Sequence, residues 1–289
     1  MSDSELCRLC GNAADSKAHV PPKSALNTRR WIAADFEIAL KTDIEEVPKG
    51  KQVQGGIYFP TLCKRCNLFI GQNYDPELGR WFRNVAPMLQ SVNDDSISFS
   101  VKKAYPSRLI RAALGMFVAI NPESFRTSPI GSEVVKLLSD TKLTGLPENL
   151  RIFMYSCKEG NLRYLPFMAQ ASLTTGRAAM FSEIAYPPLG FVLGVKAVDV
   201  DERLLDVSDF ANIDHNTNCT VEITLPILPT WSTMLPTDYR TVAELRAAEL
   251  ASISDLLKHG ENPFQMWPEL AKRYPQLAEA LAESPETNP

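Results

Sequence analysis

The sequence predicts an α+β protein in which a zinc-binding N-terminal head precedes a domain built on a mainly antiparallel sheet. Three observations lead to this expectation: two Cys-x-x-Cys pairs near the N-terminus, a helix that is apolar nearly all round, and a series of short strands after Pro147. The 289 residues are 45% hydrophobic and 22% charged, as in globular proteins with a sizeable core. We expect a boundary near residue 90, which divides the chain into residues 1–90 and residues 91–289.

The expected elements follow from apolar periodicity and from turn residues. A short strand is expected at 57–60 and a helix at 75–90, where Asp75 and Pro76 suit a helix start. A strand is expected at 96–101, and the helix at 107–120 is expected to be buried because it lacks a polar face. The remaining expected elements are a helix at 131–139, strands at 150–156, 164–173, 178–184, 191–198 and 220–225, and helices at 240–258 and 268–283. We expect these later strands to form one sheet packed by helix 107–120.

The charge of the chain is uneven but not strongly basic. The net charge is −4, whereas residues 1–90 hold 12 Lys and Arg against 10 Asp and Glu. This split is compatible with one segment that meets phosphates. No apolar run approaches the roughly 20 residues needed to span a bilayer, and the polar N-terminus does not resemble a signal peptide. We therefore expect no membrane association, a cytoplasmic location and reduced cysteines.

Four of the six cysteines form two pairs with the same spacing, Cys7 with Cys10 and Cys63 with Cys66. Two residues between the thiols let both members of a pair point at one metal, and two pairs complete the tetrahedral cage that zinc prefers. A disulfide is a poor alternative in a reducing compartment. The sequence therefore predicts one structural zinc. Cys157 and Cys219 are expected to be small buried apolar residues.

A third motif lies between the cysteine pairs: His19-Val-Pro-Pro22, and the second pair continues as Cys66-Asn67 with Gly71 four residues later. Over residues 7 to about 83, this combination resembles the HNH endonuclease family, in its zinc-braced treble-clef (ββα-metal) branch. The resemblance implies a ββα element that holds one divalent ion, Mg²⁺ or Mn²⁺, over the scissile phosphate of DNA, with RNA not excluded. It also implies that His19 is the general base that activates water and that Asn67 is a metal ligand or positioning group. A neutral imidazole suits this role near neutral pH.

One position departs from the family pattern. Residue 18 is Ala, whereas the family has a metal-ligating Asp or Glu before the histidine. Asp15, Asp75 and Glu77 are candidate substitutes, and Asp75 is favoured. The alternative is that the catalytic metal is lost and the head is a catalytically silent, zinc-finger-like module that binds nucleic acid or protein.

Basic residues gather near this motif in the sequence. With Trp31 they are expected either to form a rim that contacts phosphates or to be ordinary solvated loop residues: Lys17, Lys23, Arg29, Arg30, Lys64 and Arg65. Residues 91–289 carry no recognisable catalytic motif, although Arg163 and Glu183 are distinctive, and we expect them to bind a protein partner or regulator. His215 and His259 are expected at the surface. Heads of the HNH type often occur in bacterial defence systems, which by analogy suggests an antiviral role.

Overall fold

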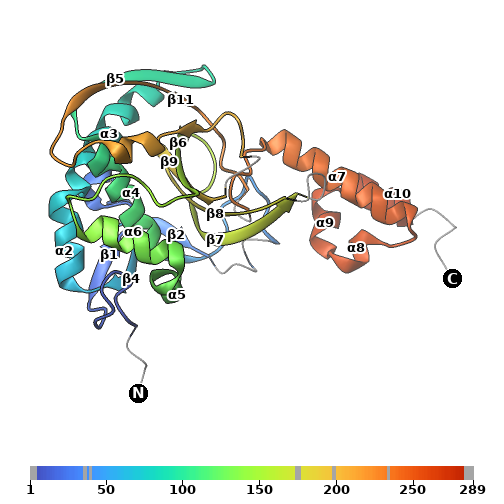
Figure 1. Ribbon diagram of the computed structural model, residues 1–289. Coiled ribbons are helices and arrows are strands. Elements are labelled where there is room, and N and C mark those ends of the chain that lie inside the picture. The colour runs from blue at the N-terminus through green and yellow to red at the C-terminus, as the bar shows by residue number, and fades with distance from the viewer. Residues whose placement is uncertain are drawn as a thin grey trace. The chain divides into compact units, whose positions relative to one another are not determined.

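A computed structural model describes residues 5–34, 38, 41–172, 177–196, 200–232 and 235–282. Helices are mixed with antiparallel sheets, so the predicted α+β class is confirmed (Figure 1). Packing divides the chain into two compact units, each described separately below. Unit 1 comprises Met1–Trp31 and Val53–Tyr239, and unit 2 comprises Ile32–Gln52 and Arg240–Pro289. This division differs from the expected boundary near residue 90.

The N-terminal part of unit 1 is a strand pair followed by two helices. Strand β1 (Ser16–His19) pairs with β4 (Tyr58–Leu62) in antiparallel fashion, and the short helix η1 (Lys23–Ala25) lies between them in the sequence. Helices α2 (Lys64–Asn73) and α3 (Asp75–Leu89) follow directly. The strand expected at 57–60 and the helix expected at 75–90 are confirmed, whereas α2 was not expected.

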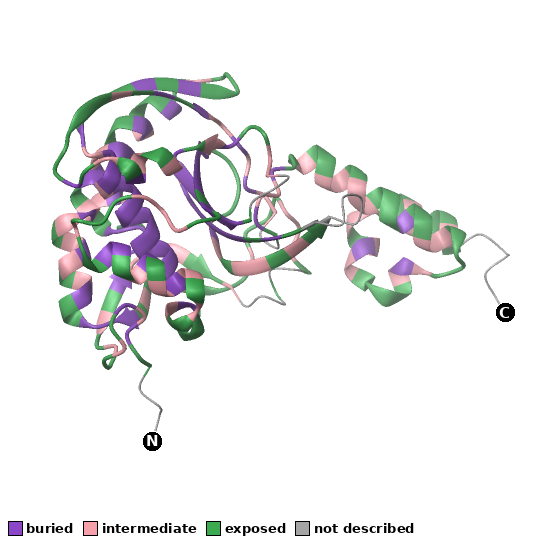
Figure 2. Ribbon diagram, in the orientation of Figure 1, coloured by how far each residue is buried: buried purple, intermediate pink, exposed green. Residues whose placement is uncertain are grey.

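Helix α4 (Pro106–Ile120) is the centre of unit 1. Every residue of α4 except Arg108 is buried, as predicted from its apolar surface (Figure 2). It packs against α3 and β4 on the N-terminal side and against strands β7 and β8 of the main sheet. One hydrophobic core therefore contains Trp81 of α3, Leu109 of α4 and Phe191 of the sheet. Because this core continues across residue 90, no packing boundary lies there.

The main sheet has five strands, and each pair of neighbours is antiparallel. In spatial order these are β10 (Leu205–Asp206), β6 (Leu150–Ser156), β9 (Leu189–Val195), β8 (Arg177–Tyr186) and β7 (Arg163–Ser172). Strand β9 is buried along its whole length because both faces of the sheet are covered. The strands predicted after Pro147 are thus confirmed, except at Leu173, Ala197 and Val198, which lie outside the described residues.

The strand expected at 220–225 exists but does not join this sheet. It is β11 (Cys219–Pro226), and it pairs with β5 (Ser96–Ala104) in a separate antiparallel ribbon. Buried Ile97, Phe99 and Val101 alternate with exposed residues on β5. Two strands that each have one apolar face can pair and turn that face to the core, so the expectation of a single sheet was wrong for this strand.

Three further short helices complete the described part of unit 1: α5 (Glu123–Thr127), α6 (Pro129–Ser139) and η2 (Ser208–Asn212). Helix α6 confirms the expectation for 131–139, and Ser128 caps it by accepting a hydrogen bond from the Gly131 N–H. Two expectations for single residues were wrong. His215 is buried with its ring against Tyr74, and Cys219 is exposed.

Unit 2 combines the C-terminal helices with a segment that lies between the cysteine pairs in the sequence. A ribbon of β2 (Trp31–Ala33) and β3 (Lys51–Val53) marks the two points where the chain leaves and re-enters unit 1. The helices are α7 (Val242–Lys258), α8 (Pro263–Met266), α9 (Pro268–Arg273) and α10 (Pro275–Ala282). The single helix expected at 268–283 breaks before Pro275, because proline lacks the N–H that would continue the helix.

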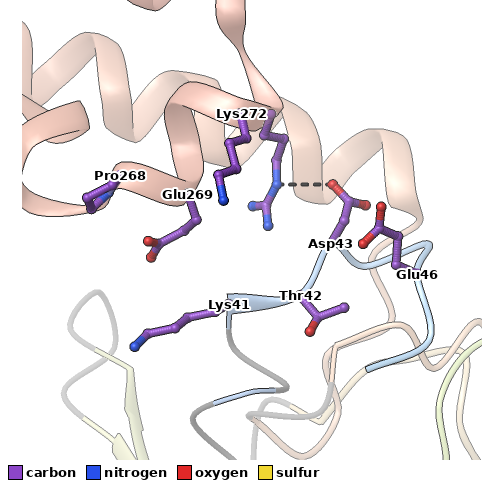
Figure 3. A pocket seen from close by; sticks show the side chains of 8 residues that line it. Lys41, Thr42, Asp43, Glu46, Pro268, Glu269 and Lys272 are labelled. Carbon is purple, nitrogen blue, oxygen red and sulfur yellow. Dashed lines mark ion pairs between the residues drawn. The ribbon is translucent and has the colours of Figure 1, made fainter. Parts of the chain in front are cut away.

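Ion pairs hold the two segments of unit 2 together. Asp43 pairs with Arg246 of α7 and, at 3.0 Å, with Arg273 of α9. Arg273 also pairs with Glu249, which accepts a hydrogen bond from the Tyr274 hydroxyl at 2.6 Å. Beside these pairs, a hollow of about 490 Å³ lies between the segment around Asp43 and α9 (Figure 3). No helix in the described part of the chain is both long and apolar enough to cross a membrane.

Candidate metal centre and adjoining histidine

The first cysteine pair lies in a tight hairpin. Leu6 and Ala13 form an antiparallel bridge, and the Gly11 N–H donates to the Cys7 carbonyl at 2.8 Å. Gly11 has φ 79°, a left-handed conformation that glycine adopts without strain. The second pair lies at the start of α2, where Cys63 is the N-cap residue and Cys66 is in the first turn. A hairpin and a helix start therefore supply two thiols each.

The four sulfur atoms lie close enough to surround one ion. Cys7, Cys10, Cys63 and Cys66 have their Sγ atoms within 4.8 Å of one another, and Cys10 Sγ is 3.6 Å from Cys63 Sγ. A tetrahedral zinc with Zn–S bonds of about 2.3 Å needs S···S separations of about 3.8 Å. The geometry and the donor type both fit, so this cluster could hold a structural metal such as zinc.

The electrostatics of the cluster agree with this assignment. Burial raises the pKa of the Cys7 thiol, but backbone hydrogen bonds at Cys63, Cys10 and Leu9 outweigh burial and lower it to about 7. Burial and the neighbouring thiols of Cys63 and Cys10 instead raise the pKa of Cys66. Four thiols at this spacing cannot all ionise unless a cation compensates their charge, and a bound zinc supplies that charge.

Two polar side chains join β1 to α2. The Asp15 carboxylate accepts a hydrogen bond from the Lys64 N–H at 2.7 Å. It thereby gives a partner to one of the backbone N–H groups that have none within the first turn of α2. The Asn67 side-chain nitrogen donates to Ser16 Oγ at 2.8 Å and to the Lys17 carbonyl at 3.2 Å. Asn67 therefore fixes the strand that carries His19 against the helix that carries Cys66. The described residues place no hydrogen-bond donor on the Asn67 side-chain oxygen.

His19 is the last residue of β1 and is half-buried. Its ring lies 5.8 Å from that of Tyr58, the residue opposite it on β4. Burial lowers the pKa of His19, the positive charge of Lys23 lowers it further, and backbone hydrogen bonds at Gly55 and Lys17 act in the opposite direction. The net effect favours a neutral imidazole, the form that a general base requires.

The candidate metal-ligating acids occupy different environments. Ala18 is buried, so its position offers no ligand, and Asp15 is engaged at the start of α2. Glu77 is buried and accepts a hydrogen bond from the Trp81 indole N–H at 2.9 Å. Asp75 is half-buried at the start of α3, and burial raises the pKa of its carboxyl to about 7. Asp75 thus remains the candidate acid, although no contact among the described residues joins it to His19.

The basic residues expected near the site are exposed: Lys17, Lys23, Arg29, Arg30, Lys64 and Arg65. Two of them have defined contacts. The Lys17 ammonium lies 4.4 Å from the centre of the Tyr58 ring, and Lys64 pairs with Asp15 at 3.7 Å. Tyr58 therefore contacts both Lys17 and His19, which brings a cation and the imidazole to one aromatic side chain.

Sequence reasoning missed the residues that brace the cysteine centre against the core. Arg8 Nη1 and Thr61 Oγ1 both donate to the Ala119 carbonyl near the end of α4, at 2.6 and 2.9 Å. Ala119 lies 111 residues after Arg8 in the sequence. No local pattern signals such a contact. The cysteine centre is thereby fixed to the main core of unit 1.

A second polar cluster lies on the other face of the main sheet. Arg163 and Glu183 are fully buried and form an ion pair in which Arg163 Nη1 donates to both Glu183 carboxylate oxygens at 3.0 Å. Glu183 also accepts hydrogen bonds from the Tyr155 hydroxyl and, at 2.8 Å, from the Thr237 N–H. Arg163 further donates to the Asp238 carbonyl. Through Thr237 and Asp238, the pair therefore binds the last segment of unit 1 to the main sheet.

Comparisons with models of known protein families, with curated proteins and with solved structures found no match.

Proposed function

We propose that the N-terminal part of unit 1 is a treble-clef-like, zinc-stabilised head that binds DNA and hydrolyses its phosphodiester bonds in the manner of HNH endonucleases. The observation that carries this proposal is the position of His19. It ends β1, the strand that Asn67 of α2 fixes through Ser16 and Lys17, and α2 also carries Cys66 of the four-cysteine cluster. The ββα arrangement of β1, β4 and α2 agrees with the fold that the resemblance implies.

The roles follow from the chemistry of each group. The neutral His19 imidazole takes a proton from the attacking water. The exposed ammonium groups of Lys17 and Lys23 contact the phosphates that flank the scissile bond. A hard divalent cation, when bound, neutralises charge that develops on the phosphate. Oxygen ligands suit such an ion, and the Asn67 side-chain oxygen and the Asp75 carboxylate are the candidates in this chain. A zinc enclosed by four thiolates has no open position for this task.

Two observations favour a second candidate, a catalytically silent nucleic-acid-binding head. Ala18 replaces the family's metal-ligating acid, and Asp15 satisfies the start of α2. Both candidates predict zinc and nucleic-acid binding, but only the first predicts cleavage.

Cleavage assays separate the two. The 289-residue protein is incubated with plasmid, single-stranded DNA and RNA in Mg²⁺ or Mn²⁺, beside His19→Ala and the control His259→Ala, which changes an exposed histidine at the end of α7. We expect His19→Ala to reduce cleavage by about 10²–10⁴ while zinc content and DNA binding persist. If the wild type cleaves none of these substrates, the second candidate, the catalytically silent head, is supported. Undiminished cleavage by His19→Ala would remove His19 from the mechanism.

A further inference from the structure

Unit 1 contains a second hollow, of about 200 Å³, that the proposed chemistry does not use. Four separate parts of unit 1 form it: the segment around Leu26 to Trp31, the C-terminal turn of α3, the residues that follow β6, and the Tyr186–Pro188 turn. Its lining is mainly apolar, with two exposed cations, Arg29 and Lys158. Among the described residues that line it, none is acidic.

Two aromatic side chains define the wall of this hollow. The Trp31 and Tyr186 rings meet edge to face with their centres 5.3 Å apart. The Tyr186 hydroxyl donates to the Leu26 carbonyl at 3.1 Å, which fixes the Tyr186 ring in this wall. The two rings therefore give the hollow an apolar aromatic wall.

The positive charge of Arg29 acts on Tyr186, one of the two aromatic residues of this wall. Burial raises the pKa of Tyr186 to about 12, and the positive charge of Arg29 acts against that rise. Lys158, which also lines the hollow, donates to the Val92 carbonyl at 3.1 Å. A ligand is therefore offered an apolar aromatic wall and two cations.

We propose that this hollow binds one unstacked nucleotide of a single strand, with its base against Trp31 and its phosphate between Arg29 and Lys158. This inference rests on the proposed function, because it makes the nucleotide part of the nucleic acid on which the head acts. The hollow is smaller than the 300–1,000 Å³ typical of sites for drug-sized ligands, so it suits one ring system. The faces of bases stack on aromatic side chains, and their phosphates bind cations.

Other small ligands match fewer of these features. Inorganic phosphate would use the two cations but not the apolar wall. A neutral aromatic molecule would use the wall but would leave the two cations without a role. A nucleotide uses both.

The test is calorimetric titration of the 289-residue protein with adenosine 5′-monophosphate, adenosine and inorganic phosphate as separate probes. We expect the monophosphate to bind more tightly than either of the others. Combined Arg29→Ala and Lys158→Ala changes should weaken its binding by at least about tenfold, and Trp31→Ala, which removes the stacking ring, should also weaken it. Lys102→Ala, an exposed change on β5 away from the hollow, should leave binding unchanged.

Binding is measured without cleavage, so the two proposals can fail separately. If the protein cleaves nothing but binds the monophosphate as expected, the site stands and the nuclease activity does not. If the monophosphate does not bind at millimolar concentration, or phosphate alone binds as well, the nucleotide site is overturned. Equal affinity in the wild type and the double variant would overturn it too.

Discussion

At the scale of single residues, the environment of His19 sets the pH range of the proposed reaction. Burial and the charge of Lys23 lower the imidazole pKa below its ordinary value of 6.5, so the neutral form persists into more acidic solution. We expect the acid limb of the cleavage rate, measured in single turnovers, to lie below pH 6.5. Lys23→Ala should move this limb to higher pH, because it removes a charge that disfavours protonation. A limb at or above pH 6.5 in the wild type would contradict the assignment.

The buried pair of Arg163 and Glu183 makes a stability prediction at the same scale. Glu183→Ala leaves the Arg163 guanidinium buried without its partner and removes the acceptor for the Thr237 N–H. We expect a loss of about 3–5 kcal/mol in the free energy of unfolding, measured by urea denaturation. Glu222→Ala on β11 changes an exposed glutamate and serves as the matched control. Similar losses in both variants would show that the buried pair contributes little.

At the scale of elements, the cysteine centre joins a hairpin to the start of α2. Cys63→Ser removes one of the four thiolates and so weakens zinc binding, which contributes directly to the free energy of folding. We expect elemental analysis to find one zinc per wild-type chain and less in Cys63→Ser, with a lowered Tm. The control Cys219→Ser changes an exposed cysteine outside the cluster and should retain both properties. Wild-type protein without metal would contradict the zinc assignment.

The burial of helix α4 predicts that truncating one of its side chains lowers the stability of the protein. Leu114 is fully buried at the centre of the core, whereas Leu68 on α2 is 61% exposed. Leu114→Ala leaves a cavity and should lower the free energy of unfolding by about 2–5 kcal/mol. Leu68→Ala, the same change at an exposed position, should cost far less. Equal costs, measured by chemical denaturation, would contradict the central place of α4.

At the scale of the whole molecule, unit 2 depends on contacts between segments far apart in the chain. Asp43 is separated by 203 residues from Arg246, its ion-pair partner. Burial raises the pKa of Asp43, but the Glu45 N–H and then Arg246 and Arg273 outweigh burial and lower it below 3.8. A carboxyl with a depressed pKa stabilises the fold above its unfolded pKa, and this contribution is lost as pH falls through the folded value.

We therefore expect hydrogen exchange in α7 and α9 to be slow at neutral pH and to accelerate once solutions fall below about pH 4, relative to the intrinsic exchange rate. Asp43→Asn should destabilise unit 2 by about 1.5–3 kcal/mol at neutral pH, because hydrogen bonds to a charged group are lost. The same variant should make that unit less sensitive to acid. Unchanged protection of α9 in Asp43→Asn would show that other contacts hold the two segments together.

The sequence by itself determined those features whose physical cause is local. The paired cysteines predict their own cluster because spacing fixes where two thiols can point, and the apolar surface of α4 predicts its burial. Tertiary structure decided the features whose cause lies far along the chain. Asp15 accepts a hydrogen bond from the first N–H of α2, at Lys64, which lies 49 residues later in the sequence. Strand β11 pairs with β5 rather than with the main sheet. Segment 32–52 joins helices that follow it by about two hundred residues, because ion pairs depend on distance in space and leave no periodic trace in the sequence.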